Sequence, residues 1–200
     1  MNFYEAADSL SGPILQVHEW IQEAQDGKVA LPHAMNIASL DSAGRPTSRM
    51  VLLKRISEEG FVFFTDYEGN KGKQISAFPH VALTFWWAKT NKQIRIEGEC
   101  SKVSEKENDE YFSSRPRGSQ ISASVSLQSQ ELESYESLTQ KSESFKKEHS
   151  NKTIERPERW GGFIVAPISI EFWIDQKNRL HKRELYSKSG TDWKKALLSP

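Results

Sequence analysis

Apolar and polar positions recur along this chain with two different periods, which divide it into a helical start and a strand-rich remainder. In GPILQVHEWIQEA, residues 12–24, apolar side chains recur every three or four positions, the spacing of a helix with one buried face. Pro13 suits the first turn of such a helix. We therefore expect an N-terminal helical segment within residues 1–25.

Short runs rich in β-branched and aromatic residues follow, and turn-forming residues separate them. The eight candidate runs are MNIASL (35–40), SRMVLLKRI (48–56), FVFFTD (61–66), VALTFWW (81–87), KQIRIEGECSKV (92–103), WGGFIVAP (160–167), ISIEFWI (168–174) and RLHKRELY (179–186). From these runs and the turns between them we expect five to seven short strands.

Polar stretches at 70–78, 106–113 and 132–149 predict further helices, the last of them on the surface because its apolar positions are sparse. Strands at this spacing, with helices between them, are typical of an antiparallel barrel of the mainly β or α+β class. The length of 200 residues fits a single domain over residues 1–200.

The charge balance limits the kinds of partner that the surface can attract. Lys+Arg and Asp+Glu each total 27, so the formal net charge is zero. This argues against a broad nucleic-acid or membrane surface, and any anion site must come from a local concentration of cations. The single cysteine, Cys100, fits a reducing compartment. The start MNFYEAADS has no apolar signal-peptide core and no run reaches the length of a membrane span, so we expect a cytoplasmic protein.

Several common catalytic motifs are missing from the sequence. The five histidines are scattered, so no metal-ligand cluster is evident. The chain contains no GxGxxG after a strand, no GxxxxGK[ST] and no GxSxG. Nucleotide-loop, hydrolase and metalloenzyme functions are therefore disfavoured.

Cations instead stand out in two stretches. In SRPRGS, Arg115 and Arg117 flank a proline beside serine hydroxyls, a combination suited to a phosphate dianion. In RLHKR, Arg179, His181 and Arg183 alternate, so a strand there would place all three side chains on one face. Any one of these cations could be an ordinary surface residue, but their grouping favours an anion site.

Flat apolar side chains provide a possible surface for an aromatic ligand. Tryptophans occur in FWW, RWGGF, EFW and DWKK, where they serve either core packing or a ring-shaped cofactor. Gly161 and Gly162 predict a bulge or a close backbone approach within a strand.

Taken in order, these motifs resemble those of the pyridoxine/pyridoxamine 5′-phosphate oxidase family. The resemblance covers about residues 13–200 and rests on RMVLLK, VFFT with a lysine in the next helix, QIRIEG, YFSSRPRGSQI, Gln128-Ser129, WGGF, IEFW and RLHxR. It implies an FMN-binding split β-barrel and a homodimer with FMN in clefts between the subunits. The implied reaction oxidises pyridoxamine or pyridoxine 5′-phosphate to pyridoxal 5′-phosphate with O2, which gives H2O2.

The resemblance also implies roles for individual residues. The FMN contacts would be Arg49, Met50, Val51, Leu52, Leu53, Lys54, Phe64, Thr65, Lys71, Gln93, Gln128, Ser129, Trp173 and Arg183. The phosphorylated vitamer would be bound by Lys54, Tyr111, Arg115, Ser119, Arg179 and His181. Of these, Arg179 and His181 would be catalytic, with the His181 imidazole suited to exchange a proton near neutral pH.

Four positions differ from the residues usual in the family: Asn70, Ser124, Lys182 and Leu197. They leave open a related FMN-dependent oxidase or reductase acting on another small aromatic ring, as in phenazine-pathway relatives. A flavin-binding protein without catalysis is a third hypothesis, against which RLH in RLHKR argues. A nucleic-acid-binding module is the least favoured, because the charge is neutral and no RNA-binding motif occurs.

Overall fold

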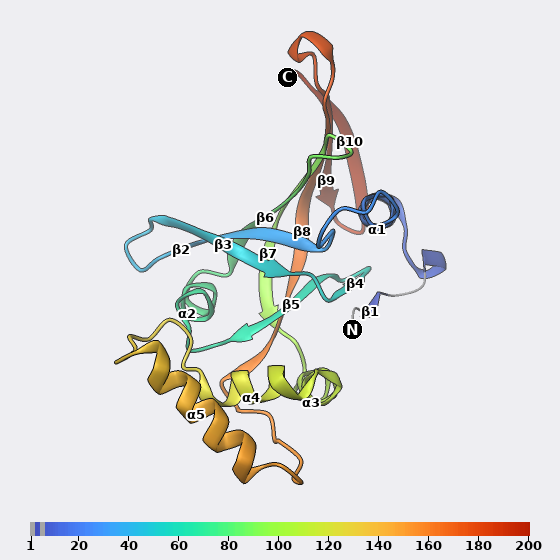
Figure 1. Cartoon of the computed structure of the whole chain (residues 1–200). Coiled ribbons are helices and arrows are strands. Elements are labelled where there is room, and N and C mark those ends of the chain that lie inside the picture. Colours follow the sequence, from blue (N-terminus) through green and yellow to red (C-terminus); the bar gives the residue numbers. More distant parts are fainter. Residues whose placement is uncertain (1–2, 5–6) are drawn as a thin grey trace.

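One long strand, β8 (Trp160–Ile174), joins the two halves of the sheet in this computed structural model (Figure 1). Along one edge β8 pairs antiparallel with β7 (Lys92–Lys102). Its other edge is divided, because its first half pairs with β5 (Gly60–Asp66) and its second half with β9 (Lys182–Ser189). The sheet therefore splits into two arms at the middle of β8.

Pro167 stands at this split, where a residue without an N–H group does least harm. The pairing with β5 ends at Val165 and the pairing with β9 begins at Ser169, so the proline removes no bond from either strand. The register with β7 also shifts here, between Glu97 and Gly98. The two runs at 160–167 and 168–174 are consequently one bulged strand.

The remaining strands extend the sheet in the order β1-β4-β5-β8-β7-β6-β2-β3, with β10 paired to β9. All pairs are antiparallel except β1 with β4. The ten strands of the described residues exceed the predicted five to seven, mainly because β1, β4 and β10 are short or polar. The predicted mainly antiparallel fold is confirmed. The bounds are β1 Phe3–Tyr4, β2 Ala34–Leu40, β3 Pro46–Leu52, β4 Arg55–Ser57, β6 His80–Trp87 and β10 Asp192–Leu198.

Five α-helices lie around the sheet in the described part of the chain, and α5 lies with α4 at the end opposite β10 (Figure 1). The four helices expected from the sequence are confirmed within a few residues at their ends. The serine-rich stretch after Pro116, for which no element was predicted, forms α4. The bounds are α1 Gly12–Asp26, α2 Asn70–Ala77, α3 Glu105–Ser114, α4 Arg117–Val125 and α5 Tyr135–Glu148.

The start of the chain is less helical than expected. The structure describes residues 3–4 and 7–200, so residues 1–2 and 5–6 of the predicted helical segment lie outside it. Strand β1 and a 3₁₀ turn precede α1, and the prediction holds only from Gly12 onward. Among the described helices, none has the length and apolar character needed to cross a bilayer.

The main core lies between α1 and the sheet. Ile14, Val17 and Ile21 on one face of α1 are buried, and the Trp20 ring meets Phe172 of β8 edge-on at 4.9 Å. Burial of these side chains follows from the helical period of the sequence and supplies most of the stability of such a layer.

Two predicted strands have different bounds in the structure, and each difference has a physical reason. The run 48–56 breaks at Leu53 and Lys54, because β3 pairs with β2 whereas β4 pairs with β5. Asn178, the last residue of DQKN, and Arg179, the first of RLHKR, have φ values of 56° and 62°, so the turn extends into RLHKR and β9 begins only at Lys182. The prediction that Arg179, His181 and Arg183 share one strand face is therefore wrong.

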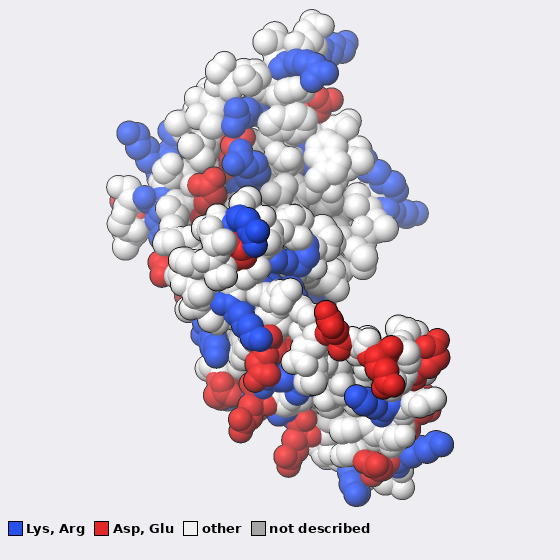
Figure 2. All heavy atoms as spheres, turned by 90° about the vertical axis from the view of Figure 1, so that its left-hand side faces the viewer, with Lys and Arg blue, Asp and Glu red and all other residues white. Residues whose placement is uncertain are grey.

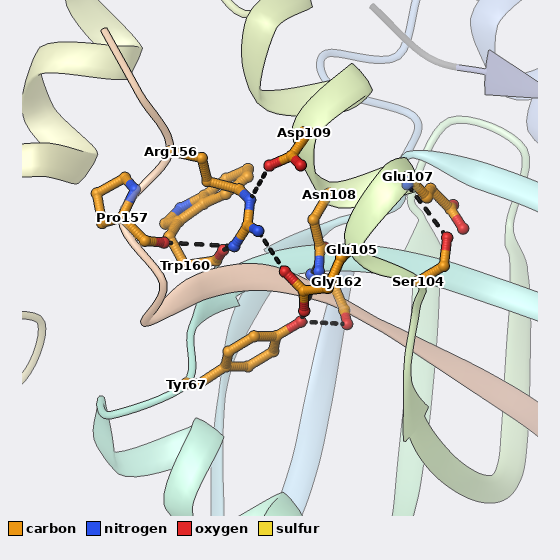
Figure 3. A network of polar contacts seen from close by, with 10 residues as sticks. All are labelled: Tyr67, Ser104, Glu105, Glu107, Asn108, Asp109, Arg156, Pro157, Trp160 and Gly162. Atoms are coloured by element: carbon orange, nitrogen blue, oxygen red, sulfur yellow. Dashed lines mark hydrogen bonds and ion pairs between the residues drawn. The ribbon is translucent and has the colours of Figure 1, made fainter.

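A buried polar network fixes the first residues of β8 to α3 (Figure 3). The Asn108 side chain, fully buried, accepts from the Gly162 N–H at 2.7 Å and donates to the Tyr67 hydroxyl at 3.3 Å. Tyr67 in turn donates to the Gly162 carbonyl at 3.0 Å. Arg156 donates to the Trp160 carbonyl at 2.8 Å and pairs with Glu105 and Asp109 of α3.

The close approach predicted at the two glycines is confirmed. A Cβ on Gly161 would lie 2.2 Å from the Tyr67 hydroxyl oxygen, and one on Gly162 would lie 2.8 Å from Phe64 Cε1. A side chain at either position would push apart the network or the aromatic ring beside it.

We predict that Gly161→Ala lowers the free energy of unfolding by about 1–3 kcal/mol, because the new methyl group displaces the hydrogen-bonded Tyr67 hydroxyl. Gly118→Ala is the matched control: nothing lies within 4 Å of its Cβ position in α4. It should raise that free energy by about 0.5–1 kcal/mol through helix propensity and chain entropy. Urea unfolding at a fixed protein concentration measures both, and equal effects would contradict the assignment.

Candidate functional site

The end of β5 and the start of α2 meet the loop after α4 in a compact polar cluster. The Thr65 hydroxyl donates to Gln128 Oε1 at 3.0 Å, and Lys71 Nζ donates to Thr65 Oγ1 at 3.1 Å and to the same Gln128 oxygen. Thr65 is buried. Burial and the nearby charge of Arg49 lower the pKa of Lys71, whereas Asp66 raises it. We call Thr65, Lys71, Gln128, Ser129 and the Asn70 N–H group the cradle.

Backbone geometry completes the cradle. The Asn70 N–H, at the first position of α2, donates to Ser129 Oγ at 3.2 Å. Ser129 adopts a φ of 70°, and a Cβ on Gly69 would lie 2.8 Å from Gln128 Oε1, so the two segments approach as closely as sterics allow. The N-cap residue of α2, Gly69, offers no side-chain acceptor, and the helix dipole at this end favours an anion.

Arg49 on β3 stands beside the cradle and is held rigidly. Its guanidinium donates to Ser39 Oγ at 2.6 Å, Thr47 Oγ1 at 2.7 Å and Gln74 Oε1 at 2.8 Å. All three partners are neutral, so no carboxylate cancels its charge, and burial lowers its pKa. Arg49 and Lys71 together make this region electropositive.

An aromatic cavity of about 420 Å³ lies on the other face of β5. Phe64 stacks on Tyr111 with ring centres 3.9 Å apart, and Trp160 continues the stack at 5.4 Å from Phe64. Lys54 also lines the cavity. The volume and the flat walls suit a small aromatic ring.

Two cations, Lys54 in the cavity wall and Arg115 near it, form no ion pair with a carboxylate of the described residues. The Arg115 guanidinium lies 4.4 Å above the Trp160 ring, and its Nη1 is buried with no hydrogen-bond partner. Burial lowers the pKa of Arg115 and of Lys54, and the Lys54 pKa is lowered further by the charge of Arg115. A buried donor of this kind calls for an anionic acceptor. Ser119 lies half-buried in the first turn of α4, after Pro116.

Arg117 does not join Arg115, which corrects the expectation drawn from SRPRGS. The Arg117 guanidinium donates to the carbonyl oxygens of His149 and Lys152, at the end of α5. Formation of α4 from Arg117 onward turns the two arginines in different directions. The stretch therefore contributes one arginine to the anion site and uses the other to cap a helix.

The predicted strand RMVLLK presents its side chains to opposite faces. Met50 and Leu52 are exposed, whereas Val51 and Leu53 lie in the core. The side chains of Val51 and Leu53 are thus unavailable to a ligand, and only their backbone groups remain for contact.

The other predicted residues gather at the far end of β7, β8 and β9. Gln93, Trp173 and Arg183 are aligned across the three strands, and the His181 ring packs 4.6 Å from Trp173. Arg183 makes a bidentate pair with the buried Glu171, at 2.7 and 3.0 Å. Arg179 is exposed in the turn before β9.

These two groups of residues are separated within one chain. Trp160 stands beside Phe64 and Arg115, and Trp173 stands beside His181, at opposite ends of β8. Thirteen strand positions at about 3.3 Å each place them about 43 Å apart along the strand. A single protomer does not bring the predicted residues into one site.

The face of the molecule shown in Figure 2 has no continuous basic patch of the kind that binds a polyanion. On the face shown in Figure 2, blue and red side chains are interspersed, and red ones are frequent over its lower half. This pattern agrees with the zero net charge and differs from the basic stripe of a nucleic-acid-binding protein.

Several residues that hold the site in place were not predicted from the sequence. They include Gln74 for Arg49, Asn108 and Arg156 for the start of β8, and Glu171 for Arg183. Their partners lie far away in sequence, so no local pattern marks them. Glu171 alone had a signal, because it is a charged residue inside the apolar run ISIEFWI.

Comparison with known proteins agrees with this arrangement. The family model described as pyridoxamine 5′-phosphate oxidase matches residues 21–147, and one described as the pyridoxine 5′-phosphate oxidase C-terminal dimerisation region matches residues 160–200. The pyridoxine/pyridoxamine 5′-phosphate oxidase of Nostoc punctiforme is 45% identical over 190 residues, which is 94% of this chain and 88% of that protein. The enzyme of the same name from Haemophilus influenzae is 44% identical over 193 residues, 96% of this chain and 91% of the relative.

Solved structures show the same fold. PhzG from Burkholderia lata, in complex with tetrahydrophenazine-1-carboxylic acid, is 30% identical with a TM-score of 0.90, covering 96% of this chain and 95% of that one. A pyridoxamine 5′-phosphate oxidase-related, FMN binding protein from Nostoc punctiforme is 14% identical with a TM-score of 0.78, covering 96% and 99%. The expected split-barrel fold is thereby confirmed. By its sequence over nearly its whole length, this chain belongs to the pyridoxamine 5′-phosphate oxidase family.

Proposed function

We propose that this protein is an FMN-dependent oxidase that converts pyridoxamine or pyridoxine 5′-phosphate to pyridoxal 5′-phosphate, with O2 as acceptor and H2O2 as product. The observation that carries the proposal is that two pairs of cations lie near β5, Arg49 with Lys71 at the cradle and Lys54 with Arg115 beside the aromatic cavity. Two phosphorylated ring compounds need two such pairs. Membership of the family supports the proposal.

The cradle fits the phosphate of FMN. Its donors are a lysine, a hydroxyl, a side-chain amide and the uncapped start of α2, which together offer charge and several N–H and O–H groups. Arg49 adds a second positive charge. In place of the arginine usual in the family, Asn70 contributes its backbone N–H. When bound, FMN supplies the redox capacity of the reaction.

The cavity fits the vitamer. Arg115 and Lys54 would bind its phosphate, with Ser119 as a further donor, and the stacked rings of Phe64 and Tyr111 would border the pyridine ring. Because Arg115 Nη1 has no hydrogen-bond partner among the described residues, an anion there would remove the cost of a buried unsatisfied donor.

A second copy of the chain would complete the site. Residues 160–200 match a family dimerisation region, and they contain Trp173, Arg179, His181 and Arg183. Because these residues lie at the opposite end of β8 from the cradle, we infer that one subunit contributes them to the cradle and cavity of its partner. Each dimer would then contain two shared sites, as two-fold symmetry requires.

His181 is suited to hold or release a proton at Nδ1. That nitrogen lies 3.0 Å from Asp175 Oδ1 and 3.2 Å from the Gln176 backbone nitrogen. A protonated Nδ1 donates to Asp175, and an unprotonated Nδ1 accepts from Gln176, so either state has a partner. Arg179, exposed beside it, would orient the anionic vitamer while the substrate C4′ carbon is oxidised.

A second candidate is the oxidation of another aromatic ring compound. It is favoured by the 0.90 TM-score with PhzG, whose structure contains tetrahydrophenazine-1-carboxylic acid. The unusual residues, however, disturb the site little. Lys182 is paired with Glu184 at 2.8 Å, Leu197 is exposed, and the Ser124 hydroxyl donates to the Gln120 carbonyl.

The test of function is a peroxide assay on the purified, FMN-loaded protein with pyridoxine 5′-phosphate, pyridoxamine 5′-phosphate and a dihydrophenazine carboxylate as separate substrates. We expect H2O2 with at least one phosphorylated vitamer. Turnover of the phenazine compound alone would establish the second candidate, and a protein that binds no FMN would refute both.

We predict that Lys71→Met weakens FMN binding about 10- to 100-fold, because a charge-assisted hydrogen bond to phosphate contributes about 1.5–3 kcal/mol. Lys73→Met is the matched control, since Lys73 is an exposed lysine on the same helix. It should leave the affinity within a factor of about two. Quenching of flavin fluorescence measures both constants, and an equal loss in the two variants would contradict the assignment of Lys71.

A second prediction concerns the shared site. Arg115→Gln and His181→Ala should each reduce turnover as homodimers, because each removes a different half of every site. Co-expression of the two variants should restore turnover to about one quarter of the wild-type value, since half of the random dimers contain one intact site. If mixed dimers form and turnover stays at the level of the single variants, both residues act within one subunit.

A further inference from the structure

Arg159 connects the two segments that form the cradle, although it contacts neither Lys71 nor Gln128 directly. Its Nε lies 3.0 Å from Asp66 Oδ2. Its Nη2 donates to the carbonyl oxygens of Ala123, Ser124 and Ser126 at 2.8, 3.0 and 3.1 Å. The Arg159 side chain is 15% exposed and that of Asp66 only 5%, so these contacts are shielded from water.

Each set of contacts ends next to a cradle residue. Asp66 directly follows Thr65 at the end of β5. The three carbonyl groups belong to the last turn of α4 and the residue after it, and the chain then continues to Gln128 and Ser129. Carbonyl groups at a helix C-terminus lack partners within the helix and attract a cation, so a single guanidinium satisfies them and fixes the loop.

Arg159 also balances a charge that would oppose phosphate. The Asp66 carboxylate is close enough to Lys71 to raise the pKa of that lysine, so it acts on the cradle. Without Arg159, a buried carboxylate would stand uncompensated beside the site for a dianion.

We propose that Arg159 is a positioning residue for the FMN phosphate, which holds the Gln128 loop against Thr65 and neutralises Asp66. The inference rests on the proposed function, because it requires FMN as the ligand of the cradle. It assigns a role to a side chain outside the predicted contacts. It also explains how the cradle keeps its shape although Asn70, at the first position of α2, stands in place of the arginine usual in the family.

The experiment compares FMN with riboflavin, which has the same ring and lacks the phosphate. We expect Arg159→Gln to weaken FMN binding by about tenfold, an effect of the size that outer contacts have on bound metal ions. Riboflavin affinity should stay unchanged. Arg117→Gln is the matched control, because Arg117 also donates to the carbonyl groups of a helix end, that of α5, without contacting the cradle.

Two further variants separate a positioning role from a general loss of structure. Arg159→Lys keeps the charge beside Asp66 with fewer donors, and should retain part of the FMN affinity. Asp66→Asn combined with Arg159→Gln removes both charges, and should bind FMN more tightly than Arg159→Gln alone. Equal losses of FMN and riboflavin affinity in Arg159→Gln and Arg159→Lys, or no loss in either, would overturn the inference. Failure of the wild-type protein to bind FMN would refute the proposed function instead.

Discussion

The divided edge of β8 is the constraint on which the rest of the structure depends. Because β5 pairs with one half of this strand and β9 with the other, a single strand both supports the cradle and cavity and carries Trp173 away from them. The separation along β8 follows from strand geometry and no side-chain movement can remove it. Sharing of the proposed site between two subunits would thus be a consequence of topology, and the dimer would be part of the binding site itself.

The second feature of the site is which of its positively charged side chains are paired with carboxylates. Arg49, Lys71, Lys54 and Arg115 form no ion pair among the described residues, and burial lowers the pKa of all four. By contrast, Arg156, which holds the start of β8, is paired with Glu105 and Asp109, and its pKa is raised. Arg183, although assigned to FMN, is likewise paired, with Glu171, and its pKa is also raised. The four cations named first therefore differ from these two, because they keep their charge for an anion.

Local sequence patterns predicted the elements well and their connections less well. The period of α1 and the β-rich runs of β2, β5, β6 and β7 were sufficient, because burial of one face is recorded in the residues themselves. The break at Leu53, the turn through Arg179 and the continuity of β8 across Pro167 were not predicted. Each depends on which strand lies alongside, and that information is not present in the local pattern.

The sequence by itself determined the class of fold, the family and the types of side chain assigned to the site, since motifs such as YFSSRPRGSQI and RLHKR preserve residue types in order. Only the tertiary structure decided that Arg115 lies over the Trp160 ring while Arg117 caps α5. It alone showed that Arg159 joins Asp66 to the end of α4, and that His181 lies far from Arg115. Direction and distance arise from packing between segments remote in sequence, and residue identity does not specify them.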